Sequence, residues 1–181
     1  MLRTILTFGL IAGFIIIVPM SFMALNVDGA GHGNFALFFG YLTMILGFSL
    51  IFMAIKRYRD QALGGVIRFG PALLLGLGIT VTASIIYVIG WELAQAMTHY
   101  AFADDYSKSM VEAARAKGAS AAKLAQVAAE AQAFKTQYAN PLYRLPMTFI
   151  EVFPVGVLIS LISAAVLRNS RILPARSAAV A

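Results

Sequence analysis

Two of the eight acidic residues lie inside apolar stretches of the sequence, and their chemistry is the first candidate for function. Glu92 is near the end of the stretch 69–97, and Glu151 is near the start of the stretch 147–167. Charge inside hydrocarbon is costly, so acids in such stretches usually serve a function. Two carboxylates at similar depth repel each other when both are ionised, and such a pair can hold a proton or a cation. We therefore predict a proton or cation site.

Polar residues accompany Glu92 at helical spacing. Gln95 and His99 follow it at intervals of three and four, which places all three side chains on one face of a helix. His32, the other histidine, precedes the apolar stretch that begins at residue 34. Imidazole and carboxylate groups are ligands for zinc and similar ions, so His32 and His99 with Glu92 and Glu151 form a second hypothesis, a metal site.

A third interpretation of the two glutamates is structural. Both lie close enough to the membrane surface to reach polar groups there, and Trp91, Tyr100 and Arg144 could bind them. The sequence leaves these three interpretations open.

Several classes of chemistry are absent from the sequence. The chain has no cysteine, which excludes disulfides, thiolate metal sites and cysteine nucleophiles. No HExxH or Gly-x-Ser-x-Gly pattern occurs, so we expect no catalytic residue and no cofactor. The leading hypothesis is a non-enzymatic scaffold, sensor or accessory subunit. The alternatives are a small proton- or cation-coupled transporter or channel subunit that uses Glu92 and Glu151, and a metal-dependent membrane enzyme.

The elements that would position these residues are membrane-spanning helices. Of the 181 residues, 60% are hydrophobic and 12% are charged, about half the charged share of a soluble globule. A spanning helix needs roughly 20 apolar residues. We expect an all-α fold, a single membrane domain over 1–181 that is a bundle of four transmembrane helices with an extracytoplasmic helical hairpin over 98–144. The expected spans are 4–25, 34–55, 69–97 and 147–167.

The excess of basic residues predicts the orientation of the bundle. The formal net charge of +6 comes from 14 Lys and Arg against 8 Asp and Glu. Short loops rich in Lys and Arg stay in the cytoplasm. We expect a multi-pass protein of the bacterial inner (cytoplasmic) membrane with both termini in the cytoplasm. Topology explains the charge, so we expect no nucleic acid partner. The residues that carry this argument are Arg3, Lys56, Arg57, Arg59, Arg68, Arg168, Arg171 and Arg176.

The segment 98–144 has the pattern of two helices. Asp104 and Asp105 supply N-cap and first-turn charge for one helix, Gly118 interrupts it, and Ser120 can cap a second helix. Asn140-Pro141 ends the second helix, because the residue before proline avoids helical angles. The second helix carries a narrow apolar stripe formed by Leu124, Val127, Ala131, Phe134 and Tyr138. The hairpin either packs on the mouth of the bundle or docks a protein partner.

The stretch 56–80, KRYRDQALGGVIRFGPALLLGLGIT, carries a distinctive motif. Its order of residues resembles a bacterial membrane family catalogued as domain of unknown function 4199. This resemblance implies a bacterial inner-membrane protein and assigns no catalytic residue. The matching positions are Arg57-Tyr58-Arg59-Asp60, Leu63-Gly64-Gly65, Phe69-Gly70 and Gly76.

The same motif predicts a cytoplasmic elbow that contacts the lipid bilayer. Each basic residue near anionic headgroups gains about 1 kcal/mol, which makes Lys56, Arg57, Arg59 and Arg68 candidates for binding anionic lipid headgroups.

Small residues predict close helix contacts. Gly9 and Gly13 form a GxxxG pair, which we consider the first choice for the interface of a homodimer, with packing inside the bundle as the alternative.

Overall fold

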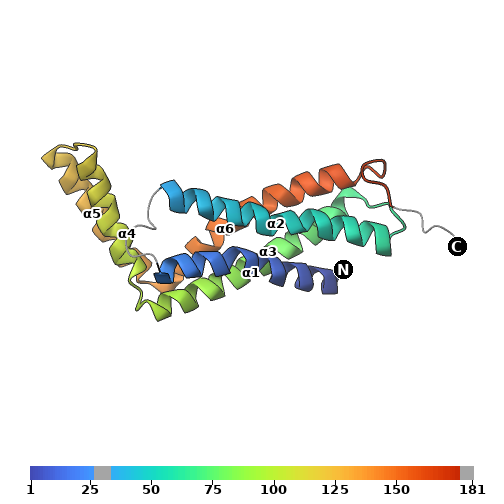
Figure 1. The fold of residues 1–181 in the computed structure, drawn as a ribbon, viewed down its shortest axis with the longest axis horizontal. Helices are drawn as coiled ribbons and strands as arrows, with labels where there is room; N and C mark the ends of the chain where they lie inside the picture. The colour runs from blue at the N-terminus through green and yellow to red at the C-terminus, as the bar shows by residue number, and fades with distance from the viewer. Residues whose placement is uncertain (27–33, 176–181) are drawn as a thin grey trace.

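The computed structural model describes residues 1–26 and 34–175, and within these ranges it contains six helices and no strand (Figure 1). This agrees with the all-α prediction. Each helix is bounded as follows: α1 Leu2–Asn26, α2 Asn34–Ala62, α3 Phe69–Met97, α4 Phe102–Ala116, α5 Ala121–Tyr138 and α6 Pro141–Leu167.

Four of the described helices are long and apolar enough to cross a membrane. The qualifying segments are Leu2–Leu25, Leu37–Ala62, Phe69–Met97 and Pro141–Leu167, with 24 to 29 residues each. At 1.5 Å per residue they are about 36 to 43 Å long, which exceeds the hydrocarbon thickness of about 30 Å. Together they indicate a membrane protein.

Two of these helices extend beyond the expected spans. α2 continues past residue 55 to Ala62, because Lys56 and Arg57 pair with residues one turn later and keep a polar segment helical: Lys56 Nζ is 2.6 Å from Asp60 and Arg57 Nε is 3.0 Å from Gln61. α6 begins at Pro141 rather than at residue 147. The Asn140 side chain accepts a hydrogen bond of 3.0 Å from the Leu142 amide, and proline suits the first helical position.

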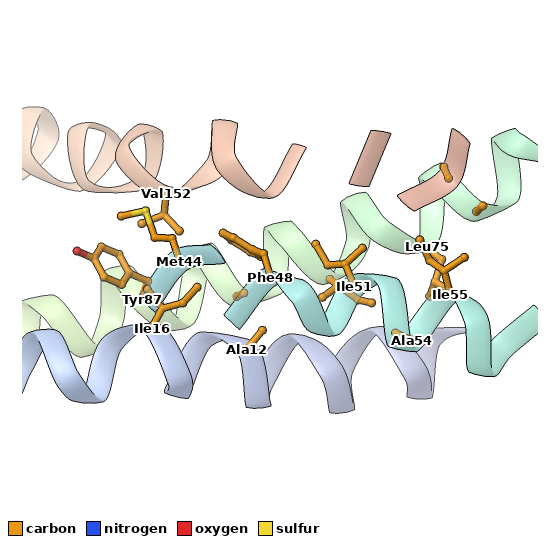
Figure 2. Close-up of a cluster of buried hydrophobic side chains, with 14 of the residues drawn as sticks. Ala12, Ile16, Met44, Phe48, Ile51, Ala54, Ile55, Leu75, Tyr87 and Val152 are labelled. Atoms are coloured by element: carbon orange, nitrogen blue, oxygen red, sulfur yellow. The ribbon is translucent and has the colours of Figure 1, made fainter. Parts of the chain in front are cut away.

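The four long helices form a ring in which α1 contacts α2 and α3, and α6 also contacts α2 and α3. Met1, the α2–α3 connection and the segment after α6 lie at one end of the bundle, whereas α4 and α5 project from the other end (Figure 1). Figure 2 shows the hydrophobic core between the four long helices. Its fully buried side chains include Ile16, Phe48, Ile51, Leu75 and Val152.

Glycines bring the long helices into close contact. A Cβ on Gly9 would lie 2.5 Å from Thr82 of α3, and a Cβ on Gly13 would lie 2.7 Å from Ile86. The Gly9–Gly13 pair is therefore occupied by α3. A homodimer through this pair would require separation of α1 from α3, so the pair serves the alternative prediction, packing inside the bundle.

Helices α4 and α5, called the hairpin below, contact each other through the apolar stripe of α5. Ala131 and Tyr138 are buried, and the Ser107 hydroxyl of α4 donates a 3.0 Å hydrogen bond to the Ala131 carbonyl. Ser120 caps α5 as expected, accepting from the Lys123 amide at 3.3 Å. Asp104 and Asp105 lie in the first turn of α4, but the N-cap position is Ala101 and has no side-chain cap.

Candidate functional site

The end of α3 and the start of α6 meet through an ion pair. The Arg144 guanidinium donates from Nε to Glu92 Oε1 and from Nη2 to Glu92 Oε2, each at 2.7 Å. The Arg144 side chain is buried, whereas a quarter of the Glu92 side chain is exposed. Two parallel N–H···O bonds fix both the distance and the angle between the groups. The negative charge of Glu92 is therefore balanced by Arg144 of the same chain.

Arg144 also contacts the hairpin and the turn that leads into it. Its Nη1 donates a 3.0 Å hydrogen bond to the Tyr138 carbonyl at the end of α5. Its guanidinium carbon lies 4.9 Å from the centre of the Tyr100 ring. Tyr100 and His99 have φ values of 59° and 51°, a left-handed conformation that non-glycine residues adopt at a cost. This turn brings the Tyr100 ring to the guanidinium.

The Tyr138 side chain fastens the hairpin to α3. Its hydroxyl accepts hydrogen bonds from Trp91 Nε1 at 2.9 Å and from Gln95 Nε2 at 3.4 Å. Its ring contacts Phe102 of α4 and Phe134 of α5, at centroid distances of 5.5 and 5.2 Å. Burial raises the pKa of the Tyr138 phenol, so the hydroxyl stays protonated at neutral pH. Glu92, Arg144, Tyr138 and Trp91 together are called the junction clamp below.

A pocket opens beside the junction clamp. Its volume is about 360 Å³, and charged and aromatic side chains line it together. Across its rim Lys135 Nζ of α5 lies 2.7 Å from Asp104 Oδ1 of α4, and both side chains are nearly half exposed. The lining residues are Tyr100, Ala103, Asp104, Lys135, Tyr138, Ala139, Pro141 and Arg144. The site is amphipathic, and it contains no nucleophile paired with a base.

The predicted ion and metal residues do not assemble. Glu92 is bound by Arg144, Gln95 by Tyr138, and Glu151 is exposed on α6. His99 is exposed in the turn after α3. Within residues 1–26 and 34–175, no group of three or more His, Cys, Asp or Glu residues could hold a metal ion. His32 lies outside the described residues.

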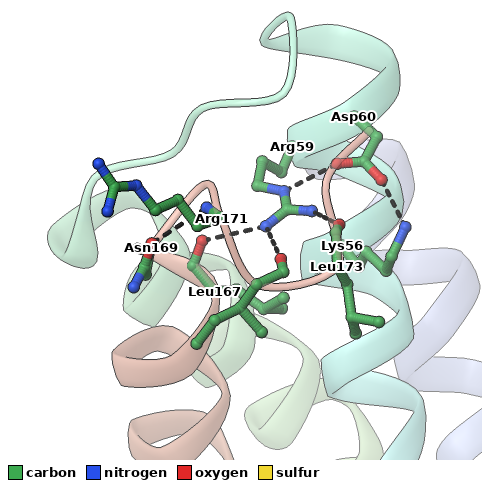
Figure 3. A network of polar contacts seen from close by, with 8 residues as sticks. Lys56, Arg59, Asp60, Leu167, Asn169, Arg171 and Leu173 are labelled. Atoms are coloured by element: carbon green, nitrogen blue, oxygen red, sulfur yellow. Dashed lines mark hydrogen bonds and ion pairs between the residues drawn. The ribbon is translucent and has the colours of Figure 1, made fainter. Parts of the chain in front are cut away.

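The opposite end of the bundle contains a second buried arginine (Figure 3). Arg59 of α2 is fully buried and pairs with Asp60 at 2.7 Å. Its guanidinium donates to the carbonyl of Leu167 at 3.4 Å, to that of Ile172 at 3.1 Å and to that of Leu173. It thereby caps the end of α6 and holds the following segment.

This burial changes the set of lipid-headgroup candidates. Arg59 donates to protein carbonyls and has no exposed surface, which is incompatible with a headgroup contact. Arg57 and Arg68 are exposed, and Lys56 is partly exposed but paired with Asp60. Arg57 and Arg68 are thus the residues of this set that present charge at the surface.

From the sequence, Arg144 is one of several groups that could bind the glutamates, and Tyr138 has no predicted role beyond the apolar stripe. One signal was present, because Arg144 follows Asn140-Pro141 and precedes the apolar stretch, at a depth similar to that of Glu92. The hydrogen bonds of the Tyr138 hydroxyl had no local signal, since its partners are more than 40 positions away.

Comparison with known proteins assigns a family and no activity. No curated protein and no solved structure matches the chain significantly. The model of one family, described as a protein of unknown function, matches residues 7–169 and thus nearly the whole chain. The chain therefore belongs to the DUF4199 family of proteins of unknown function.

Proposed function

We propose that this chain is a non-enzymatic scaffold or accessory subunit of the bacterial cytoplasmic membrane, and that it presents the α4–α5 hairpin to a protein partner outside the cytoplasm. The observation that carries the proposal is the junction clamp. Arg144 binds Glu92 of α3 and the Tyr138 carbonyl of α5 at once, so the hairpin has a defined direction relative to the bundle. A tethered but free segment would need no such contact.

The charge distribution supports an orientation with both termini in the cytoplasm. Exposed Arg57, Arg68, Arg168 and Arg171 gather at the end of the bundle that holds the α2–α3 connection. Basic residues in short loops favour the cytoplasmic side. The hairpin at the opposite end then lies outside.

Single cysteines test this orientation cleanly, because the chain has none of its own. Ala113→Cys is exposed on α4, and Leu63→Cys is exposed in the α2–α3 connection. In spheroplasts, we expect a membrane-impermeant maleimide to label Ala113→Cys at once and Leu63→Cys only after permeabilisation. The reverse pattern would contradict the orientation.

A photo-reactive amino acid at the exposed hairpin positions Glu112 and Gln126 tests the partner. We expect one discrete protein adduct from these positions and none from Phe14, which is exposed on α1 and faces lipid. The adduct should weaken when Glu92→Gln loosens the junction clamp. Absence of an adduct at every exposed position of the hairpin would contradict the proposal.

Glu151 favours a second candidate function, a proton- or cation-coupled transporter or channel subunit. Glu151 is exposed on a spanning helix and forms no ion pair with any described residue. Flux into liposomes is the test, with Glu151→Gln compared with the hairpin variant Glu112→Gln. Loss of flux in Glu151→Gln alone would support transport, and flux no greater than in empty liposomes would exclude it.

A further inference from the structure

An apolar pocket lies in the groove between α3 and α6, on the membrane side of the junction clamp. Its volume is about 260 Å³, and its lining is entirely hydrophobic. The lining residues are Ile85, Val88 and Ile89 of α3, and Leu145, Pro146 and Phe149 of α6. Both helices are spans, so this pocket opens at the depth of hydrocarbon.

The apolar pocket and the charged pocket beside the clamp are both lined by α6. Pro141, Leu145 and Phe149 recur every four residues and share one face of α6. Pro141 lines the charged pocket, whereas Leu145 and Phe149 line the apolar one. From Pro141 to Phe149 the helix rises about 12 Å. The pockets along α6 therefore change from apolar to polar along the direction in which a membrane changes from hydrocarbon to headgroup.

The charges at the polar end are balanced. Arg144 and Lys135 supply two positive groups, and Glu92 and Asp104 supply two negative groups. A guanidinium has five N–H donors, and the three contacts of Arg144 described above leave donors that can reach a further acceptor. The Lys135–Asp104 pair is nearly half exposed on both sides, so it is weak and can open to new partners.

We propose that these two pockets together bind one zwitterionic glycerophospholipid of the phosphatidylethanolamine type. Part of one acyl chain occupies the apolar pocket, the phosphate lies beside Arg144 and Lys135, and the ammonium lies beside Asp104. A lipid without net charge complements a site without net charge, whereas an anionic lipid would add negative charge next to Glu92 and Asp104. Tyr100 and Tyr138 line the charged pocket, and tyrosine is enriched at headgroup depth in membrane proteins.

The proposed lipid site involves the base of the hairpin at Asp104 and Lys135, whereas Glu112 and Gln126, the positions that test the partner, lie at least eight residues further along α4 and α5. The two proposals can therefore fail independently. The lipid site also lies at the end of the bundle opposite to Arg57 and Arg68, the exposed candidates for anionic headgroups.

Native mass spectrometry of the full-length protein in detergent tests this proposal with two probes, palmitoyl-oleoyl phosphatidylethanolamine and the matching phosphatidylglycerol. We expect one retained phosphatidylethanolamine, preferred over phosphatidylglycerol by roughly fivefold, the factor that one exposed charge contact can supply. Leu145→Trp fills the apolar pocket and should abolish retention. Leu142→Trp, which is on the same helix and 85% exposed outside both pockets, is the matched control and should retain the lipid.

A charge variant keeps the test decisive if Leu145→Trp does not fold. Asp104→Asn removes one negative group from the exposed rim and should shift the preference toward phosphatidylglycerol. Equal retention of the two lipids by the original protein, or equal retention by Leu145→Trp and Leu142→Trp when both fold, would show annular lipid only and would overturn the proposal. An unchanged lipid preference in Asp104→Asn would overturn it as well.

Discussion

Arg144 and Arg59 are buried arginines at opposite ends of the bundle, and both contact residues that are distant in sequence. Taking a guanidinium out of water is costly unless its hydrogen bonds and its charge are met nearby. Arg144 meets this requirement with a carboxylate, a carbonyl and a tyrosine ring. Arg59 meets it with one carboxylate and three carbonyls.

At this scale we predict that Glu92→Gln destabilises the protein. The substitution leaves the Arg144 charge buried without its counter-charge, a loss that costs about 3 to 5 kcal/mol for a fully buried pair. Glu92 is a quarter exposed, so we expect about 2 kcal/mol. Unfolding in mild detergent, followed by circular dichroism, measures the change.

Glu112→Gln is the control for this prediction, because Glu112 is exposed on α4 outside the spans and should change stability by less than about 0.5 kcal/mol. The double variant Glu92→Met with Arg144→Met should be more stable than Glu92→Gln, since it removes both charges together. Equal stability of Glu92→Gln and Glu112→Gln would contradict a structural role for the ion pair.

At the scale of the element, the C-terminal end of α6 depends on α2. The last carbonyls of a helix have no partner within the helix, and Arg59 supplies donors to the Leu167 carbonyl and to the carbonyls of the segment that follows. The segment 168–175 thus packs back on the bundle although it is not helical beyond Leu167.

We predict that Arg59→Met releases this segment. Removal of the guanidinium leaves the carbonyls of Leu167, Ile172 and Leu173 without their donor, so the segment should fray. Hydrogen exchange over residues 168–175 should become at least tenfold faster, which corresponds to about 1.4 kcal/mol of lost protection. Arg57→Met, two positions away and exposed, is the matched control and should leave exchange unchanged.

The elements also show what a sequence can and cannot predict. Four long helices follow from four apolar stretches, because apolar length is a local property. The predicted span starts too late, since two prolines and Arg144 interrupt the apolar pattern of residues 141–146, whereas the cap at Asn140 starts the helix at Pro141. Arg59 was expected at a headgroup because a basic residue after an apolar stretch resembles an interfacial one. Its carbonyl partners are more than 100 positions away, and no local pattern encodes them.

At the scale of the whole molecule, close packing holds the ring of four helices together. Between lipid-embedded helices there is little hydrophobic driving force, so small residues and short hydrogen bonds decide the contact. At the α3–α6 contact, Gly156 lies against Thr80, and the Thr80 and Ser160 hydroxyls are 3.1 Å apart.

We predict that Gly156→Ala lowers stability by about 1 to 3 kcal/mol, the usual cost of an added methyl group in a packed core. The new Cβ would overlap Thr80 Cγ2, so the Thr80 side chain or the two helices must shift. Gly70→Ala is the control, because no atom lies within 4 Å of that position and alanine favours the helix. Thermal unfolding of both variants in the same detergent measures the difference, and equal midpoints would contradict the packing argument.

The position of α6 at the end of the chain has a consequence for the synthesis of the protein. Glu92 belongs to the third long helix in chain order, whereas its counter-charge is on the last, so in the proposed membrane bundle a chain still being synthesised has no ion-pair partner for Glu92 until Arg144 is made. The two arginine networks then close almost together, Arg144 at the start of α6 and the acceptors of Arg59 at its end. Addition of the last helix therefore completes the contacts at both ends of the bundle. A truncated chain without this helix would keep three long helices, with Glu92 and Arg59 lacking these partners.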